Sequence, residues 1–123
     1  MILADTSVWA DHLRLSEPIL AELLVRGEVV MHPFVLGEIA LGHIRKRSQW
    51  MLALSELPAV HVADPEEVLQ MIEQRKLVAQ GVGYVDVHLL ATTLTSRGVR
   101  LWSRDKRLRD MASEFGIAAR LDH

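Results

Sequence analysis

The stretch MILADTSVWADHLR, residues 1–14, decides the fold because it places a carboxylate directly after an apolar run. Residues 1–4 are typical of a short buried strand, and Asp5 follows at its carboxyl end. In open α/β proteins the carboxyl ends of the strands form the edge where ligands bind. We therefore predict that Asp5 lies at a ligand-binding edge of a sheet.

The rest of the chain alternates between predicted strands and predicted helices. Further strands are predicted over residues 29–32, 60–62 and 99–102, with a last strand or tail over 117–121. Helices are predicted for the segment between Ser16, as N-cap, and Gly27, for a segment opening at Pro33, for residues 48–57, for a segment capped by Asp64, and for residues 84–97 and 105–115. This alternation favours an α/β fold with a mainly parallel sheet and helices on both faces.

Length and composition narrow the classes of protein. The 123 residues carry no internal repeat or linker, so we expect one domain over residues 1–123. Cysteine is missing, which excludes disulfides, thiolate zinc sites and cysteine nucleophiles. There is no basic leader and no apolar run near the roughly 20 residues that span a bilayer, so we expect a cytoplasmic protein that does not enter membranes.

The charge of the chain is close to balanced. A net charge of -2 argues against a protein that holds nucleic acid by its overall charge. Basic residues nevertheless crowd around one acid, because Arg104, Lys106, Arg107 and Arg109 flank Asp105. Local positive surface is therefore expected beside an acidic residue.

Four acidic residues are candidates for a shared site. Asp5 and Asp105 follow predicted strands, and Asp86 falls in the first turn of a predicted helix. Each of these aspartates could also be an ordinary helix cap or helix-dipole partner. Glu38 lies in PFVLGEIALG, residues 33–42, which is otherwise nearly all apolar and has no basic partner. A buried glutamate there would require a cation or a partner, and we favour this interpretation over an exposed helix face.

Convergence of these four carboxylates would favour binding of a divalent cation. Their mutual repulsion would raise their pKa values and oppose folding until a cation relieved it. An all-oxygen site suits Mg²⁺ or Mn²⁺, which keeps several waters and binds through one or two carboxylates and substrate phosphate. The residues themselves therefore predict a metal site for phosphodiester chemistry.

Four segments carry a resemblance to a known family. They are ADTSVWADHLR (4–14), HPFVLGEIALG (32–42), GVGYVDVHLLA (81–91) and LWSRDKRL (101–108). In order and approximate spacing they resemble the motif blocks of PIN-domain ribonucleases, and among these the VapC-type toxins of bacterial toxin-antitoxin pairs. The resemblance spans essentially the whole chain and implies a PIN-like three-layer sandwich.

The resemblance also implies a function and roles for single residues. Asp5, Glu38, Asp86 and Asp105 match the catalytic, metal-binding acids of the family, and Thr6 and Ser103 match hydroxyl positions that would support the acids or contact substrate. The implied reaction is endonucleolytic cleavage of RNA with Mg²⁺ or Mn²⁺. The implied partners are an RNA substrate, a second copy of the chain in a homodimer, and a cognate antitoxin that silences the enzyme.

Other interpretations fit the residues less well. A metal-free ribonuclease would use paired histidines, but His32 lacks a second histidine at a strand end, so we expect the histidines to serve in packing or at the surface. A haloacid-dehalogenase phosphatase would have a second aspartate where Ser7 stands, and a receiver domain an acidic pair and a late lysine. A PIN-like module that only binds a partner is the remaining alternative, and loss of one of the acids would favour it.

Overall fold

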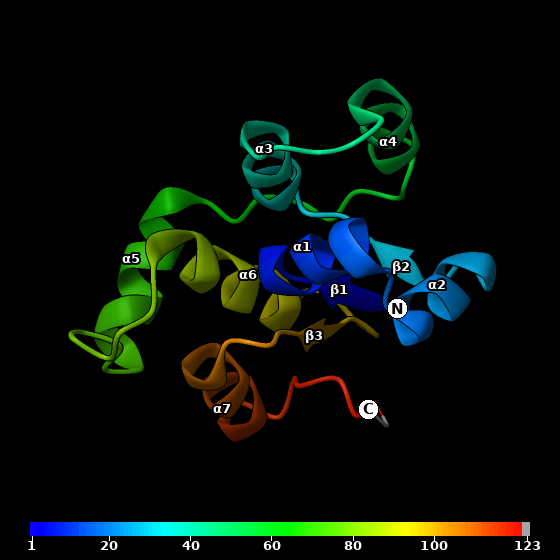
Figure 1. Ribbon diagram of the computed structural model, residues 1–123. Coiled ribbons are helices and arrows are strands. Elements are labelled where there is room, and N and C mark those ends of the chain that lie inside the picture. The colour runs from blue at the N-terminus through cyan, green and yellow to red at the C-terminus, as the bar shows by residue number, and fades with distance from the viewer. Residues whose placement is uncertain (122–123) are drawn as a thin grey trace.

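Three parallel strands form the centre of the protein, in a computed structural model that describes residues 1–121 (Figure 1). The sheet has the order β2-β1-β3, where β1 is Ile2–Ala4, β2 is Val29–Val30 and β3 is Arg100–Trp102. Leu3 pairs with Val30 on one side and with Leu101 on the other. The first strand is therefore central, and Asp5 leaves the sheet at its carboxyl edge.

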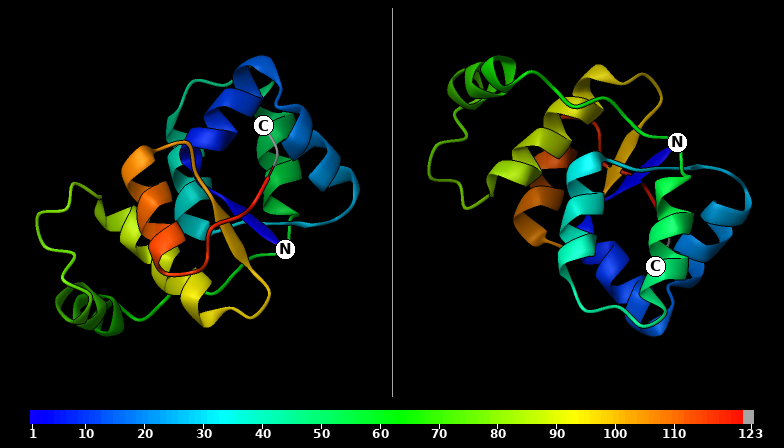
Figure 2. Two further views of the ribbon diagram at one scale, coloured as in Figure 1. Left: turned by 90° about the horizontal axis from the view of Figure 1, so that it is seen from below. Right: turned by 90° about the horizontal axis from the view of Figure 1, so that it is seen from above.

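Seven helices in the described part of the chain surround this sheet. They are α1 (Thr6–Leu15), α2 (Pro18–Val25), α3 (Pro33–Leu41), α4 (Arg47–Ser55), α5 (Pro65–Gln74), α6 (Tyr84–Thr95) and α7 (Lys106–Glu114). The connections β1 to β2 and β2 to β3 cross the sheet in opposite directions, and α3 of the second connection packs against α1 of the first. In Figure 1, α3 and α4 lie above the strands and α7 lies below them; Figure 2 shows the strands enclosed when seen from below and from above. The predicted α/β class with a parallel sheet is confirmed, and none of the described helices could cross a bilayer.

The strand predicted over residues 60–62 is wrong, and the segment 117–121, predicted as a last strand or tail, forms a tail with one bridge. In place of a strand over 60–62 there is a single parallel bridge between Met31 and Ala59, after which the His61 carbonyl accepts a hydrogen bond from Thr92 at 3.0 Å. That bond takes the chain out of the ladder. Residues 117–121 likewise contribute one parallel bridge, Leu101 to Ala118, beside β3. Both segments lie at the edges of the sheet, where few partners fix a strand.

The junction between α1 and α2 also differs from the prediction. No element was predicted for residues 6–15, which form α1. Ser16 is not the N-cap of the next helix: it ends α1 with a φ of 62°, and its N–H bonds the His12 carbonyl. Glu17 takes the capping role, since its carboxylate accepts from the Ile19 N–H at 3.2 Å.

The core packs directly behind Asp5. Leu3, Trp9, Leu90 and Trp102 are buried among apolar side chains from the strands and from α1 and α6. Burial of each such side chain stabilises the fold by about 1.5–3 kcal/mol. The histidines within residues 1–121 behave as expected, because His12, His32 and His88 are buried in packing positions while His43 and His61 are exposed; His123 lies outside the described residues. The strand end that carries Asp5 is therefore held by a rigid support.

Candidate active site

Asp5 is a buried carboxylate fixed by hydroxyl groups. Its side chain is 4% exposed and caps α1, accepting from the Val8 N–H at 3.2 Å. Ser7 donates to Oδ1 at 2.5 Å, and Ser103 donates to Oδ2. Burial raises the pKa of Asp5 above its ordinary 3.8, although these hydrogen bonds act in the opposite direction. The carboxylate is thus oriented. Oδ1 already accepts two hydrogen bonds, whereas Oδ2 accepts one and keeps a lone pair for a further ligand.

Asp105 stands on the neighbouring strand end. Its carboxylate caps α7 by accepting from the Leu108 N–H at 3.0 Å, and its own N–H donates to Ser103 Oγ at 3.0 Å. Ser103 therefore connects the two aspartates, since the same hydroxyl donates to Asp5. The aspartates do serve as helix caps, as their positions allowed, and capping leaves the side chain of Asp105 exposed to solvent.

Glu38 is exposed, so the expectation that it is buried among apolar residues is wrong. On α3 the core-facing positions are Val35 and Ile39, one turn apart, and Glu38 projects from another side of the helix. Its carboxylate accepts a hydrogen bond from the Thr6 hydroxyl at 2.6 Å. Thr6 begins α1, directly after Asp5, so this bond joins α3 to the strand end that carries the buried aspartate.

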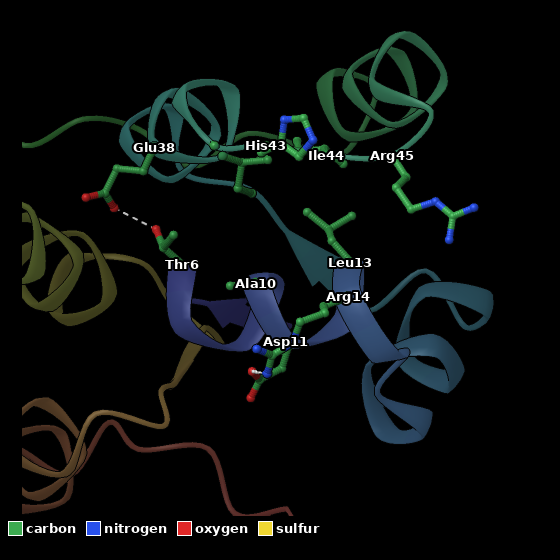
Figure 3. Close-up of a pocket in the computed structure, with 11 residues that line it drawn as sticks. Thr6, Ala10, Asp11, Leu13, Arg14, Glu38, His43, Ile44 and Arg45 are labelled. Carbon is green, nitrogen blue, oxygen red and sulfur yellow. Dashed lines mark hydrogen bonds and ion pairs between the residues drawn. The ribbon is translucent and has the colours of Figure 1, made fainter.

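A pocket of about 400 Å³ lies between α1 and the end of α3 and opens beside this pair. Figure 3 shows Thr6 and Glu38 joined at one end, with Leu13 and Ile44 toward the other. Arg14, His43 and Arg45 also line it, whereas Asp5, Asp86 and Asp105 do not. The acidic site and the pocket therefore meet at Thr6 and Glu38.

Asp86 interacts electrostatically with the other three acids. It is half-buried in the first turn of α6. Burial raises its pKa most, and the charges of Asp5, Asp105 and Glu38 raise it further, against a hydrogen bond from the backbone of Gly83. Residues from four separate segments, 19 to 100 positions apart in the sequence, are thus brought close enough to repel.

These carboxylates suit a hard divalent cation with an incomplete protein ligand shell. Among residues 1–121 no group of three or more histidine, aspartate or glutamate side chains is placed to hold one ion. The four acids therefore do not form a closed cage. Mg²⁺ and Mn²⁺ fit such a site, because magnesium commonly binds one or two carboxylates and completes its shell with water and phosphate. Burial raises the pKa values of Asp5 and Asp86, and the charge of Asp5 raises that of Asp86 further. A bound cation would stabilise both charged forms, so these two side chains are the best suited to hold it.

Comparison with known proteins identifies the family. The family model described as PIN domain matches residues 2–114. The chain belongs to the PIN-domain family. Two proteins named Ribonuclease VapC32, from Mycobacterium tuberculosis strains CDC 1551 / Oshkosh and ATCC 25618 / H37Rv, are each 43% identical to it over 118 residues, which cover 96% of this chain and 95% of each relative. The resemblance of the four motif segments to PIN-domain proteins of the VapC type is confirmed.

Two residues of this PIN domain are absent from the predicted site. Ser7 accepts a hydrogen bond from the Arg104 N–H at 3.0 Å while it donates to Asp5. The Arg104 side chain reaches two acids of the first helices. A hydroxyl two positions after a helix-capping aspartate is the signal that could have identified Ser7. The sequence shows Arg104 beside Asp105, but it does not show the partners of Arg104, which lie 87 or more positions away in the chain.

Proposed function

We propose that the protein is a divalent-metal-dependent endoribonuclease and the toxin of a toxin-antitoxin pair. The observation that carries the proposal is the connection of the two strand-end aspartates through Ser103, whose hydroxyl donates to Asp5 and accepts from the Asp105 N–H. The charges of Asp5, Asp105 and Glu38 also help to raise the pKa of Asp86. Repulsion of Asp86 by the other three acids would oppose folding unless a cation relieved it. The relatives named Ribonuclease VapC32 supply the choice of RNA as substrate.

The proposed division of labour follows from how each side chain is held. A bound divalent ion activates water and neutralises charge on the leaving oxygen of the phosphodiester. Asp5 provides a rigid ligand, since Ser7 and Ser103 fix both of its oxygens. Ser103 also holds the backbone of Asp105, and Thr6 holds Glu38. These hydroxyls would keep the carboxylates within reach of the ion, and the adjoining pocket with Arg14 and Arg45 suits an RNA strand.

Cleavage of structured RNA tests this proposal directly. We expect endonucleolytic products with Mg²⁺ or Mn²⁺, none with EDTA, and a loss of at least about a hundredfold in Asp5→Asn, more than outer-shell substitutions usually cause. Asp64→Asn is the matched control, because Asp64 caps α5 and asparagine is an equally good cap. Cleavage that persists in EDTA or in Asp5→Asn would refute the metal mechanism. A folded protein that binds RNA without cutting it would instead favour a non-catalytic PIN-like module.

We further propose that an antitoxin silences the enzyme through the acidic site. A guanidinium group presented by the partner would pair with these carboxylates and displace the metal, since its fork matches a carboxylate. We expect the product of a neighbouring gene to co-purify with the chain and to abolish RNA cleavage. A co-purified partner that leaves cleavage at full rate would contradict this mechanism of silencing.

Three further properties belong to the same proposal. Residues 1–123 would act as a single PIN domain, of which 122 and 123 lie outside the described residues. The active form would be a homodimer, as the family resemblance implies. Its site of action would be the cytoplasm, where an RNA substrate and a co-expressed antitoxin are both available.

A further inference from the structure

We propose that Arg104 is a positioning residue that fixes the loop bearing Ser103 and Asp105 against Asp5. The proposal rests on the proposed function, because it assigns a role within the same acidic site. Arg104 lies between the two residues of that loop, just after the end of β3. It contacts α1 and the start of α2, and its guanidinium also lies beside Trp102.

The backbone of Arg104 closes a ring of hydrogen bonds around Asp5. Its N–H donates to Ser7 Oγ at 3.0 Å, and Ser7 in turn donates to Asp5 Oδ1. On the other side, Ser103 donates to Asp5 Oδ2 and accepts from the Asp105 N–H. The Asp5 N–H itself bonds the Trp102 carbonyl at 2.9 Å. The position of Asp105 relative to Asp5 therefore depends on how firmly the loop is held.

The side chain of Arg104 secures the loop from outside this ring. Its Nε lies 3.1 Å from Asp11 Oδ2 on α1, and its terminal nitrogen lies 2.5 Å from Glu17 Oε2 at the start of α2. The guanidinium also stands 5.8 Å from the centre of the Trp102 ring. One cation thus connects the active-site loop to two successive helices and to the core.

This ion pair differs from the other ion pairs of the described residues in its burial. The side chain of Arg104 is 32% exposed and that of Glu17 16%, whereas both partners in the pairs Arg26–Glu22 and Lys106–Asp110 are mostly exposed. Exposed pairs contribute little, but the guanidinium of Arg104 is partly buried, donates a hydrogen bond to Glu17 and forms an ion pair with Asp11. Glu17 is itself fixed, because its other oxygen caps α2. The arrangement therefore orders the loop before any ligand binds.

A comparison of Arg104→Ala with Arg26→Ala separates positioning from surface charge. Arg26 also pairs with an acid of the first two helices, Glu22, but both partners are exposed and Arg26 does not line the pocket proposed for RNA. For Arg104→Ala we expect amide hydrogen exchange at residues 104 and 105, followed by NMR without metal, to accelerate about tenfold. We also expect kcat for RNA to fall about tenfold or more and the half-saturating Mn²⁺ concentration to rise, as for other groups that orient metal ligands. Arg26→Ala should stay within about twofold of the parent on every measure.

The same measurements can overturn the proposal. Unchanged exchange at residues 104 and 105 in Arg104→Ala would do so, as would a raised KM with unchanged kcat and Mn²⁺ dependence, which would make Arg104 a substrate contact. Slow exchange at the core amide of Leu101 shows that a variant is folded. If Arg104→Ala does not fold, Glu17→Gln, which weakens one of the two ion pairs of Arg104, must show the same changes to a smaller degree. If the parent protein cleaves no RNA, the proposed function fails, while hydrogen exchange and Mn²⁺ binding still decide the role of Arg104.

Discussion

Asp86→Asn is expected to lower RNA cleavage by at least about a hundredfold and, in EDTA, to raise the temperature of unfolding. The two effects have one cause. Asp86 carries a raised pKa because it is half-buried and is repelled by Asp5, Asp105 and Glu38, so its charge opposes folding when no cation is bound. Asparagine keeps the shape of the side chain and removes the charge. The variant would therefore be a more stable protein without a metal ligand.

Thermal unfolding with and without Mg²⁺ measures both the stability that Asp86→Asn gains and the metal binding that it loses. The parent should gain stability as Mg²⁺ is added, because an ion that binds only the folded state stabilises it, and Asp86→Asn should lose most of that gain. Asp110→Asn is the matched control: it removes an exposed acid of α7 that pairs with Lys106 at 2.9 Å. It should leave cleavage and the Mg²⁺ response unchanged. Full activity in Asp86→Asn, or a lower unfolding temperature in EDTA, would contradict a repulsive metal site.

Asp5 and Asp105 could be predicted as site residues because each follows a predicted strand. Asp5 and Asp105 each follow a short apolar run, and parallel strands bring such ends to one edge of a sheet. The helices were predictable for a similar reason, since Pro33, Pro65 and Gly83 mark their starts. These are local signals, and local signals survive folding when the hydrophobic pattern agrees with them.

The errors concern features that depend on distant residues or on rotation about a helix axis. Glu38 has apolar neighbours along the chain, but Leu41 of the same helix is 89% exposed, so adjacency in sequence did not report burial. The ring that joins Ser7 to Arg104 spans 97 positions and leaves no pattern in either segment. The strand predicted over residues 60–62 was wrong because a single bridge, at Ala59, offers too little pairing to impose strand periodicity.

His32 is expected to make the protein lose about 3 kcal/mol of stability as the pH falls from 6.5 to 4. Its ring is fully buried, and burial first, then the charges of His88 and His61, lowers its pKa from 6.5 to about 4. Between pH 6.5 and 4 His32 is protonated in the unfolded chain but largely neutral in the folded protein, so acid favours unfolding. The stability is complete above pH 6.5 and is lost progressively down to pH 4.

Urea unfolding of His32→Asn between pH 7.5 and 4 isolates this contribution. Histidine Nδ1 accepts from the Phe34 N–H at 2.9 Å to cap α3, and asparagine can cap the helix without titrating in this range. The variant should be less stable at pH 7.5, because the ring's contacts with Phe34 and His88 are lost, but its stability should fall less steeply with acid. Asp5 and Asp86 act in the opposite direction, since a carboxyl with a raised pKa gains its proton earlier in the folded state, and the variant retains both. The difference between the stability–pH curves of the parent and of His32→Asn therefore comes from His32. His43→Asn, at an exposed histidine, is the control and should match the parent. Parallel curves for the parent and His32→Asn would show that His32 does not govern the acid response.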